Sequence, residues 1–356
     1  MDSLIKGRSP VGPAARRRAL GLLFSAVSVA ALGSALHGCG GGGGGTVPEP
    51  SPPPPAPTPS PSPSGPIAAQ MSVPTPVGYD AERLAAFNRL NEIRLSAGLG
   101  MVAQSTAMDL AAQAHADWMV ANDVFSHQEQ AGTPGFTATD WSLRDEVFGY
   151  VPVGGAEVMA ASGQASAEVD ALVNALYHRA GMLAFEPVDV GIGWSGGTAA
   201  HVAMPLVIDM SRPGSDAVRG LGQAAQQTID GVAIWPLDHA NDVPMRLGLE
   251  SPNPVPDQDV LSLGTPVSIT VDRLKSLSSA SFALTDNATG AIVPTRLLSN
   301  QTDPNFLIPP SFVAAVPLAV LSPDTTYTAT YSGTASTLSG NVENIHRTWS
   351  FTTAAN

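Results

Sequence analysis

Residues 40–66 set the first limit on how this chain can fold. Residues 40–45 are six consecutive glycines, and from Pro48 to Pro66 prolines recur among serine, threonine and alanine. This stretch has almost no apolar side chains to bury, so it cannot form a packed core. The glycines supply a flexible joint, and the prolines favour a polyproline II helix of roughly 60 Å if fully extended. We therefore expect residues 39–75 to form a disordered tether ahead of the folded part.

The segment before the tether has the features of an export signal. Basic residues, among them Arg16 to Arg18, precede an uncharged stretch over residues 19–36, and Cys39 follows as the single cysteine of 356 residues. A basic region, an apolar region and a cleavage zone with small residues are typical of a signal peptide. Residues 36–39 resemble the bacterial lipobox, although His37 stands where that motif has a small residue. We expect residues 1–38 to be a lipoprotein signal peptide and Cys39 to carry the lipid.

This interpretation predicts where the protein resides. A lipid on Cys39 would attach the exported chain to a bilayer of the cell envelope. Gly40 replaces the aspartate that is linked to inner-membrane retention in many diderm bacteria, which favours the outer membrane. An uncleaved helical anchor is the alternative, because 18 uncharged residues are almost enough to span a bilayer. The arginine run also fits a twin-arginine export route.

Charge narrows the possible partners. Residues 1–38 hold five of the basic and one of the acidic residues, so 12 basic and 29 acidic residues remain in the mature chain, a formal net charge of -17. Such a surface repels phosphate backbones, so we expect no nucleic-acid partner. With Cys39 assigned to the lipid, the chain has no cysteine left for a disulfide or a thiolate metal site.

Residues 76–212 are predicted to form a first, α+β domain. Asp80 and Ser105 are suited to cap two helices, and a third helix is expected over residues 166–176 after a turn-rich segment, residues 128–155. Strands are expected over residues 188–194 and 201–210, around a Gly-Gly turn. Helices followed by an antiparallel hairpin indicate an α+β sandwich. On the second helix we expect one apolar face, formed by Leu110, Ala111, Ala114 and Trp118.

Residues 231–356 have a different pattern, and a Gly- and Gln-rich linker, residues 213–230, precedes them. Short alternating runs such as residues 267–271 and 327–331 are separated by turns, which is typical of an all-β sandwich. Residues 321–329 and 349–353 resemble the last strands of bacterial immunoglobulin-like domains. We expect this second domain to bind or to act as a spacer, and each half is complete enough to fold alone.

Three side chains stand out as candidates for chemistry, namely His127, Glu157 and His178. Histidine changes its charge near neutral pH and binds metals well, so two histidines with a carboxylate could form a site. Glu129 is a weaker candidate, as a base close to His127 in the sequence. The spacing does not match the His-Glu-x-x-His pattern of zinc peptidases.

The surroundings of these residues resemble the CAP superfamily, which includes cysteine-rich secretory proteins, insect venom antigens and plant pathogenesis-related proteins. The resemblance covers about 135 residues, and its specificity lies in the order and spacing of several short motifs. The motifs are residues 87–94, residues 110–115, residues 122–127, residues 135–150, residues 177–179 and residues 190–193.

The resemblance implies a three-layer α-β-α fold whose cleft holds two histidines and two acidic residues, with a divalent metal in some relatives. His127, Glu157 and His178 match three of these four positions. The fourth, acidic position falls near Ala175, which can neither bind a metal nor transfer a proton. The usual Gly-Glu-Asn-Ile of the family appears as Gly155-Ala156-Glu157-Val158, without the asparagine. These departures weaken the implied metal site.

Two functions remain open at the level of sequence. Two imidazoles and one carboxylate could hold Zn²⁺ with one open position, as in a metal-dependent hydrolase of peptide or cell-wall substrates. A hydrolase also needs a placed base and an oxyanion stabiliser, and no motif supplies them. We therefore expect a non-catalytic binding module whose cleft takes a peptide, glycan or lipid, with a divalent metal such as zinc as a candidate cofactor.

Overall fold

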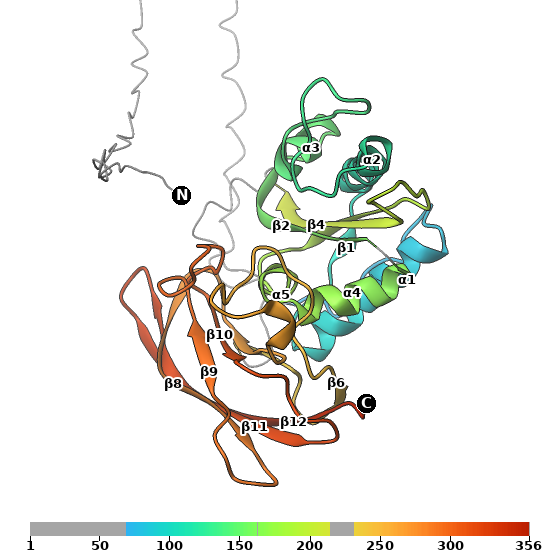
Figure 1. Ribbon diagram of the computed structural model, residues 1–356. Coiled ribbons are helices and arrows are strands. Elements are labelled where there is room, and N and C mark those ends of the chain that lie inside the picture. Colours follow the sequence, from blue (N-terminus) through green and yellow to red (C-terminus); the bar gives the residue numbers. More distant parts are fainter. Residues whose placement is uncertain (1–68, 162, 214–230, 356) are drawn as a thin grey trace, which may run out of the picture. The chain divides into compact units, whose positions relative to one another are not determined.

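The computed structural model describes residues 69–161, 163–213 and 231–355 (Figure 1). The expected signal peptide with Cys39, the tether up to residue 68 and residues 214–230 of the expected linker lie outside the described residues. Residues 69–75, which composition assigns to the tether, contact the folded part. The Gln70 side-chain amide donates to the main-chain oxygen atoms of Met101 and Val188, each at 3.3 Å, and Val73 packs against the core.

Two long helices begin where the capping residues predict. Helix α1 spans Ala81–Ser96, and the Asp80 carboxylate accepts the main-chain N–H of Arg83 at 2.8 Å. Helix α2 spans Thr106–Asn122 after Ser105, whose side chain accepts the N–H of Met108. These bonds satisfy N–H groups that the first turn of a helix leaves free.

The expected apolar face of α2 is partly wrong. Leu110 is 52% exposed, because it lies on the solvent side of the helix. The buried face is rotated from the expected one and includes polar groups. Its members are Met108, Asp109, Ala111, Ala112, His115, Ala116, Trp118 and Met119.

The segment after α2 contains more regular structure than its turn-rich composition indicates. Helix α3 spans Trp141–Val147 and begins after Asp140, whose carboxylate accepts the N–H of Leu143 at 3.2 Å. Strand β2 spans Pro152–Ala161, so Glu157 lies on a strand. Within the predicted turn-rich segment, residues 128–140 and 148–151 lie outside helices and strands.

The expected helix over residues 166–176 is interrupted. Helix α4 spans Ala165–Asn174 and helix α5 spans Leu176–Met182. Ala175 separates them with extended backbone angles, φ −81° and ψ 149°, which redirects the chain. As a result His178 lies in the first turn of a separate short helix.

Four strands form the sheet of the N-terminal domain in the order β1-β3-β4-β2. Strands β3 (Asp189–Trp194) and β4 (Pro205–Pro213) form the predicted antiparallel hairpin, and β2 pairs with the other edge of β4. Strand β1 (Ala103–Gln104) runs parallel to β3. The register places Glu157 opposite Asp209.

Helices cover both faces of this sheet, as Figure 1 shows with α2 on one side and α1 and α4 on the other. Alternate residues of β4 divide between the two faces: Ile208 packs with the core under α1 and α4, whereas Val207 packs with Ala112 of α2. The predicted three-layer α-β-α arrangement is confirmed.

The C-terminal domain is the predicted β-sandwich. Its two four-stranded sheets have the orders β5-β7-β10-β9 and β6-β12-β11-β8, and one apolar core contains residues of both sheets. The strands are β5 (Ala233–Trp235), β6 (Ala240–Val243), β7 (Val267–Thr270), β8 (Lys275–Asp286), β9 (Thr295–Leu298), β10 (Phe312–Pro317), β11 (Thr326–Thr337) and β12 (Val342–Thr353).

A further apolar core is shared by the two domains. Leu176 and Ala180 of α5 belong to the same buried cluster as Leu247, Val255 and Phe312 of the sandwich. Both domains lie in one compact unit, Pro59–Asn356. Helix α5 is therefore packed between the sheet of one domain and the sandwich of the other.

In the part of the chain described here, every helix is too short or too polar to cross a lipid bilayer.

Candidate functional site

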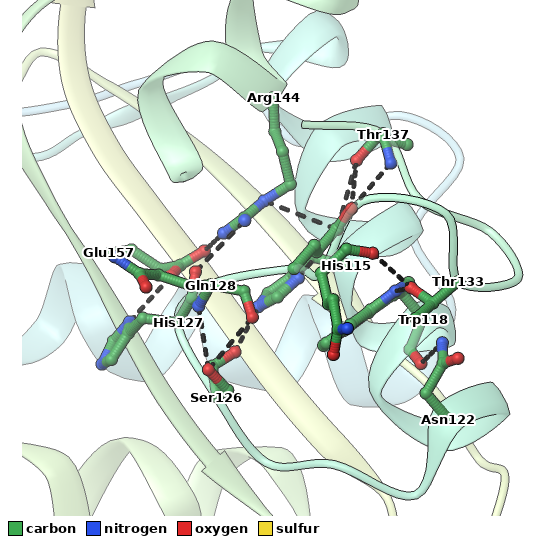
Figure 2. Close-up of polar contacts among 12 residues, drawn as sticks. His115, Trp118, Asn122, Ser126, His127, Gln128, Thr133, Thr137, Arg144 and Glu157 are labelled. Carbon is green, nitrogen blue, oxygen red and sulfur yellow. Dashed lines mark hydrogen bonds and ion pairs between the residues drawn. The ribbon is translucent and has the colours of Figure 1, made fainter. Parts of the chain in front are cut away.

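His127 and Glu157 lie together although 30 positions separate them. His127 is in the loop that follows α2, and its Nδ1 is 2.7 Å from Oε1 of Glu157 on β2 (Figure 2). A carboxylate only accepts hydrogen bonds, so Nδ1 carries the hydrogen. The His127 side chain is 53% exposed and that of Glu157 only 1%, so the glutamate is an internal support for an accessible imidazole.

Arg144 of α3 holds Glu157 from the other side. Its Nη2 donates to Oε2 of Glu157, and its Nη1 donates to the main-chain oxygen of His127 at 3.2 Å. Burial acts to raise the pKa of Glu157, but the hydrogen bond from His127 and the charge of Arg144 outweigh it and hold that pKa below its ordinary value. Glu157 is therefore a carboxylate with both oxygen atoms bonded.

Glu129, the weaker candidate, has hydrogen-bond partners other than His127. Its carboxylate bonds Nδ1 of His115 at 2.9 Å, accepts the main-chain N–H of Thr137 at 2.7 Å and lies 3.9 Å from Nε of Arg144. Glu129 is 3% exposed, and the His115 ring stacks on Trp118. This network holds the loop that carries His127 against α2.

His178 approaches His127 from α5. The two ring centroids are 6.5 Å apart and the rings are inclined by 27°. Nδ1 of His178 is 3.0 Å from Oε1 of Glu250, a residue of the C-terminal domain. Among the described residues neither Nε2 atom has a hydrogen bond, so the two free imidazole nitrogens belong to neighbouring rings that are each fixed through Nδ1.

Glu250 is the part of this site that sequence reasoning missed. Its carboxylate also accepts the main-chain N–H groups of Leu176, Tyr177 and His178, which are the first of α5. No local sequence motif predicts that Glu250 contacts His178, because the two residues are 72 positions apart and lie in different domains. A carboxylate of the C-terminal domain thus lies at the start of α5, directly after Ala175.

Two further acids lie buried behind Glu157. Asp145 and Asp209 are both inaccessible to solvent, and their carboxyl oxygens have no hydrogen-bond partner among the described residues. Burial and the negative charge of Glu157 raise the pKa of Asp145 to about 7. Burial, Glu157 and Asp145 raise the pKa of Asp209 well above its ordinary range. Both acids behind Glu157 are therefore harder to ionise than ordinary aspartates.

The residues fit a divalent metal only in part. Within the described ranges no three His, Cys, Asp or Glu side chains converge as ligands for one ion. The reason is that the oxygens of Glu157 are bonded to His127 and Arg144, which leaves two imidazole Nε2 atoms as the available ligands. A catalytic zinc site has three protein ligands. The two histidines are one ligand short of such a site, although the Nδ1 atom of each is bonded to a carboxylate, as is usual for histidines that bind metals.

Other chemical groups near the pair are engaged elsewhere. The Ser126 hydroxyl donates to the main-chain oxygen of Gln128 at 3.0 Å, so it is not directed at His127 as a nucleophile. A surface hollow of about 550 Å³ lies on the sandwich, and none of its lining residues belongs to the histidine pair. They are Arg246, Gln258, Asp259, Leu261, Ser262, Leu318, Ala319 and Val320.

The fold and the site together define a three-layer α-β-α domain with a supported histidine pair, of the type that the sequence resemblance predicts. Residues 87–202 match the model of the CAP family, described as the cysteine-rich secretory protein family, and this segment is a CAP domain. No curated protein matches the chain.

Solved structures show a distant likeness. An extracellular protein containing an SCP domain from Bacillus anthracis is 20% identical, with a TM-score of 0.31 over 37% of this chain and 40% of that one. This chain therefore spans less than half the length of the Bacillus protein. An outer surface protein from Borrelia burgdorferi is 15% identical, with a TM-score of 0.32 over 37% and 92% of the two chains. Scores of this size carry no functional information.

Proposed function

We propose that this protein is an exported, lipid-anchored binding module whose CAP domain takes a ligand at His127 and His178. One observation carries the proposal: the two rings are neighbours, and each has Nδ1 bonded to a buried glutamate and Nε2 free of hydrogen bonds within the described chain. Fixed imidazoles of this kind accept hydrogen bonds from N–H and O–H groups of a ligand. The ligand classes we propose are a peptide, a glycan or a lipid.

The support for binding over hydrolysis lies in the two carboxylates. The alternative, a metal-dependent hydrolase, would use Glu157 with His127 and His178 as ligand or base. Glu157 is bonded to Arg144, and Glu250 to three main-chain N–H groups. A general base must be within reach of its substrate's proton, and both carboxylates are instead saturated by donors from the protein.

A divalent metal such as zinc is a second candidate occupant of the pair. The favouring observation is again the Nδ1–carboxylate contact on each ring, since such contacts fix the tautomer and make Nε2 a better ligand. Neutral imidazole binds the metal, so occupancy should fall below about pH 6. The other coordination positions would belong to solvent or ligand.

We propose further that Cys39 carries the lipid and that the proline-rich tether presents the CAP domain away from the membrane of the cell envelope. The C-terminal sandwich, with its two four-stranded sheets, supports an immunoglobulin-like domain in this arrangement. Cys39→Ser should release the protein in soluble or unprocessed form. Unchanged membrane retention with an uncleaved N-terminus would instead favour a helical anchor.

The site is tested with His127→Ala and His178→Ala in the chain from residue 40 onward. Zinc binding is measured by calorimetry, and ligand binding by co-sedimentation with purified cell-wall sacculi and with liposomes of bacterial lipid. The proposal expects both variants to fold normally and to lose the same interaction. If neither variant changes any interaction, the site is wrong. If metal-dependent turnover accompanies stoichiometric zinc, the hydrolase is correct.

A further inference from the structure

Glu250 makes an unusual set of contacts for a residue outside its own domain's core. It belongs to the sandwich part of the chain, yet its fully buried carboxylate lies against the first turn of α5. One oxygen, Oε1, accepts the main-chain N–H of Tyr177 at 2.8 Å and lies 3.0 Å from Nδ1 of His178. The same carboxylate therefore bonds the backbone of α5 and the ring of His178.

Among the described residues, Glu250 is the side chain that caps the N-terminus of α5. Ala175 occupies its N-cap position and forms no side-chain bond, since alanine has no acceptor. The free N–H groups at a helix start need acceptors when they are buried. Glu250 accepts these N–H groups, so the position of its carboxylate is fixed independently of the contact with His178.

The domain contact around Glu250 is extensive and specific. The Tyr177 hydroxyl donates to Asp303 at 2.6 Å, and the buried guanidinium of Arg179 donates to the main-chain oxygen of Pro266 at 2.8 Å. The N–H of Gly248 donates to the main-chain oxygen of Asn174 at 3.2 Å, in a position where a Cβ would meet the backbone of α4 at about 2.9 Å. Glu250 is thus held by its own segment as well.

The two histidines are supported in parallel ways from different domains. Glu157 is saturated by Arg144 and bonds His127, whereas Glu250 is saturated by main-chain N–H groups and bonds His178. Which imidazole nitrogen carries the proton is set by the hydrogen bond of the other nitrogen. A carboxylate at Nδ1 leaves the lone pair on Nε2, on both rings.

We propose that Glu250 is a positioning residue for the histidine pair, and that the β-sandwich thereby completes the binding site of the CAP domain. The role rests on the proposed function, because it concerns the same pair. Glu250 does not touch the ligand. It holds His178 as the Nδ1–H tautomer, with Nε2 available beside the ring of His127.

The test uses the chain from residue 40 onward with ¹⁵N-labelled histidine. Long-range ¹H–¹⁵N NMR spectra at pH 8 report the tautomer of each ring, and calorimetry reports the affinity for zinc alone. Glu250→Ala removes the acceptor, whereas Glu250→Gln keeps an amide oxygen that can take the place of Oε1, where it still accepts from Tyr177 N–H and from Nδ1 of His178. Circular dichroism confirms that each variant is folded.

We expect the His178 signals to move from the Nδ1–H towards the Nε2–H form in Glu250→Ala and to stay near those of the wild type in Glu250→Gln, while those of His127 stay unchanged in both. Loss of a carboxylate behind a metal-binding histidine lowers affinity by about 10–100-fold, and the same loss of zinc affinity is expected here. The matched control is Asp303→Asn, which alters the domain contact at Tyr177 without touching His178. It should leave both measurements as in the wild type.

The outcomes separate the two proposals. An unchanged His178 tautomer in folded Glu250→Ala overturns the positioning role, even if His127→Ala still abolishes binding. An equal loss in Asp303→Asn also overturns it, because the effect would then come from a loosened domain contact. If wild-type protein binds no zinc but Glu250→Ala changes the tautomer, the metal proposal fails and the positioning role stands.

Discussion

Arg144 depends on Glu157 for its charge balance. Its guanidinium is completely buried. Among the described residues its ion-pair partners are Glu157, in direct contact, and Glu129, whose carboxylate oxygen is 3.9 Å from Nε. Removing one partner of a buried pair leaves the other charge uncompensated, which costs about 3–5 kcal/mol. Glu157→Ala should therefore lower the free energy of unfolding by about 3 kcal/mol or more, measured by urea denaturation.

The half-exposed neighbour serves as the control for this prediction. His127→Ala removes the other group bonded to Glu157 but leaves the pair with Arg144 intact, so it should change stability by less than about 1 kcal/mol. A Glu157→Ala variant as stable as His127→Ala would contradict the structural role given to Arg144.

The buried acids predict an unusual dependence of stability on pH. Asp145 has a pKa raised to about 7 by burial and by Glu157, against about 3.9 when unfolded, and Asp209 is raised as well. Between these values the folded state binds more protons than the unfolded state. This contribution is fully present below about pH 4 and is lost as pH rises through about 7.

Asp145→Asn tests this behaviour, because the amide resembles the protonated acid at every pH. The melting temperature of the wild type should fall between pH 5 and pH 8, and the variant should show a smaller fall. A gain of about 1 kcal/mol at pH 8 would raise the melting temperature by roughly 2–4 °C. Parallel curves for the two proteins would contradict the assignment.

At the scale of single residues, sequence reasoning brought His127, Glu157 and His178 to attention because recognisable motifs surround them. It offered Glu129 as a base near His127 from sequence proximity alone, whereas the carboxylate bonds His115 and Thr137. It also had no means to find Glu250, whose contacts depend on how two domains dock. Local patterns carry information about neighbours within an element and little about contacts between domains.

Among the elements, α2 and β3 are packed unusually closely. A Cβ on Gly193 would lie 2.2 Å from the backbone of Ala112, and one on Gly191 would meet the backbone of Met108 at the same distance. Helix backbone cannot rotate away as a flexible side chain can. Gly193→Ala should therefore cost about 3 kcal/mol, at the upper end of the usual penalty for overpacking.

Gly196→Ala is the matched control in the turn after β3. Its Cβ would approach only the far edge of the Trp194 ring, at 3.4 Å. We expect this variant to unfold in urea within about 0.5 kcal/mol of the wild type. Equal destabilisation by both substitutions would show that glycine flexibility, and not helix contact, is what the strand requires.

Elements that are stabilised by local contacts can be predicted from the sequence, whereas those that depend on contacts with another domain cannot. Helices α1 and α2 can be predicted from their capping residues and apolar repeats, and the β3–β4 hairpin can be predicted from its Gly-Gly turn. Helix α5 cannot be predicted in this way, because the N–H groups of its first turn are bonded to Glu250 of another domain and not to a local capping residue. The sequence does not predict α3 and β2, because the apolar residues of the long turn-rich segment show no clear helix or strand period.

For the whole molecule, the sequence predicted the order of the two domains and their fold classes, and this is confirmed. The expectation that each half is complete enough to fold alone takes no account of the shared core at α5. Arg179 is buried there, and burial lowers its pKa to about 9 while its N–H groups bond main-chain oxygens of both domains. Composition cannot reveal such a contact, since the residues on each side look like ordinary core.

The shared core predicts that the two domains unfold together. Leu247 is 6% exposed and packs with Leu176 of α5, whereas Leu249, two positions away, is 79% exposed. Leu247→Asp places a charge in this core without a partner, which belongs to the substitutions that cost more than about 4 kcal/mol. In calorimetry the wild type should show one transition, and Leu247→Asp should show two, with the CAP domain melting at the lower temperature because α5 loses its support.

Leu249→Asp should keep the single transition near the wild-type temperature. Two separate transitions in the wild type would mean that the domains are energetically independent, and Glu250 could then be released from His178 without unfolding either one.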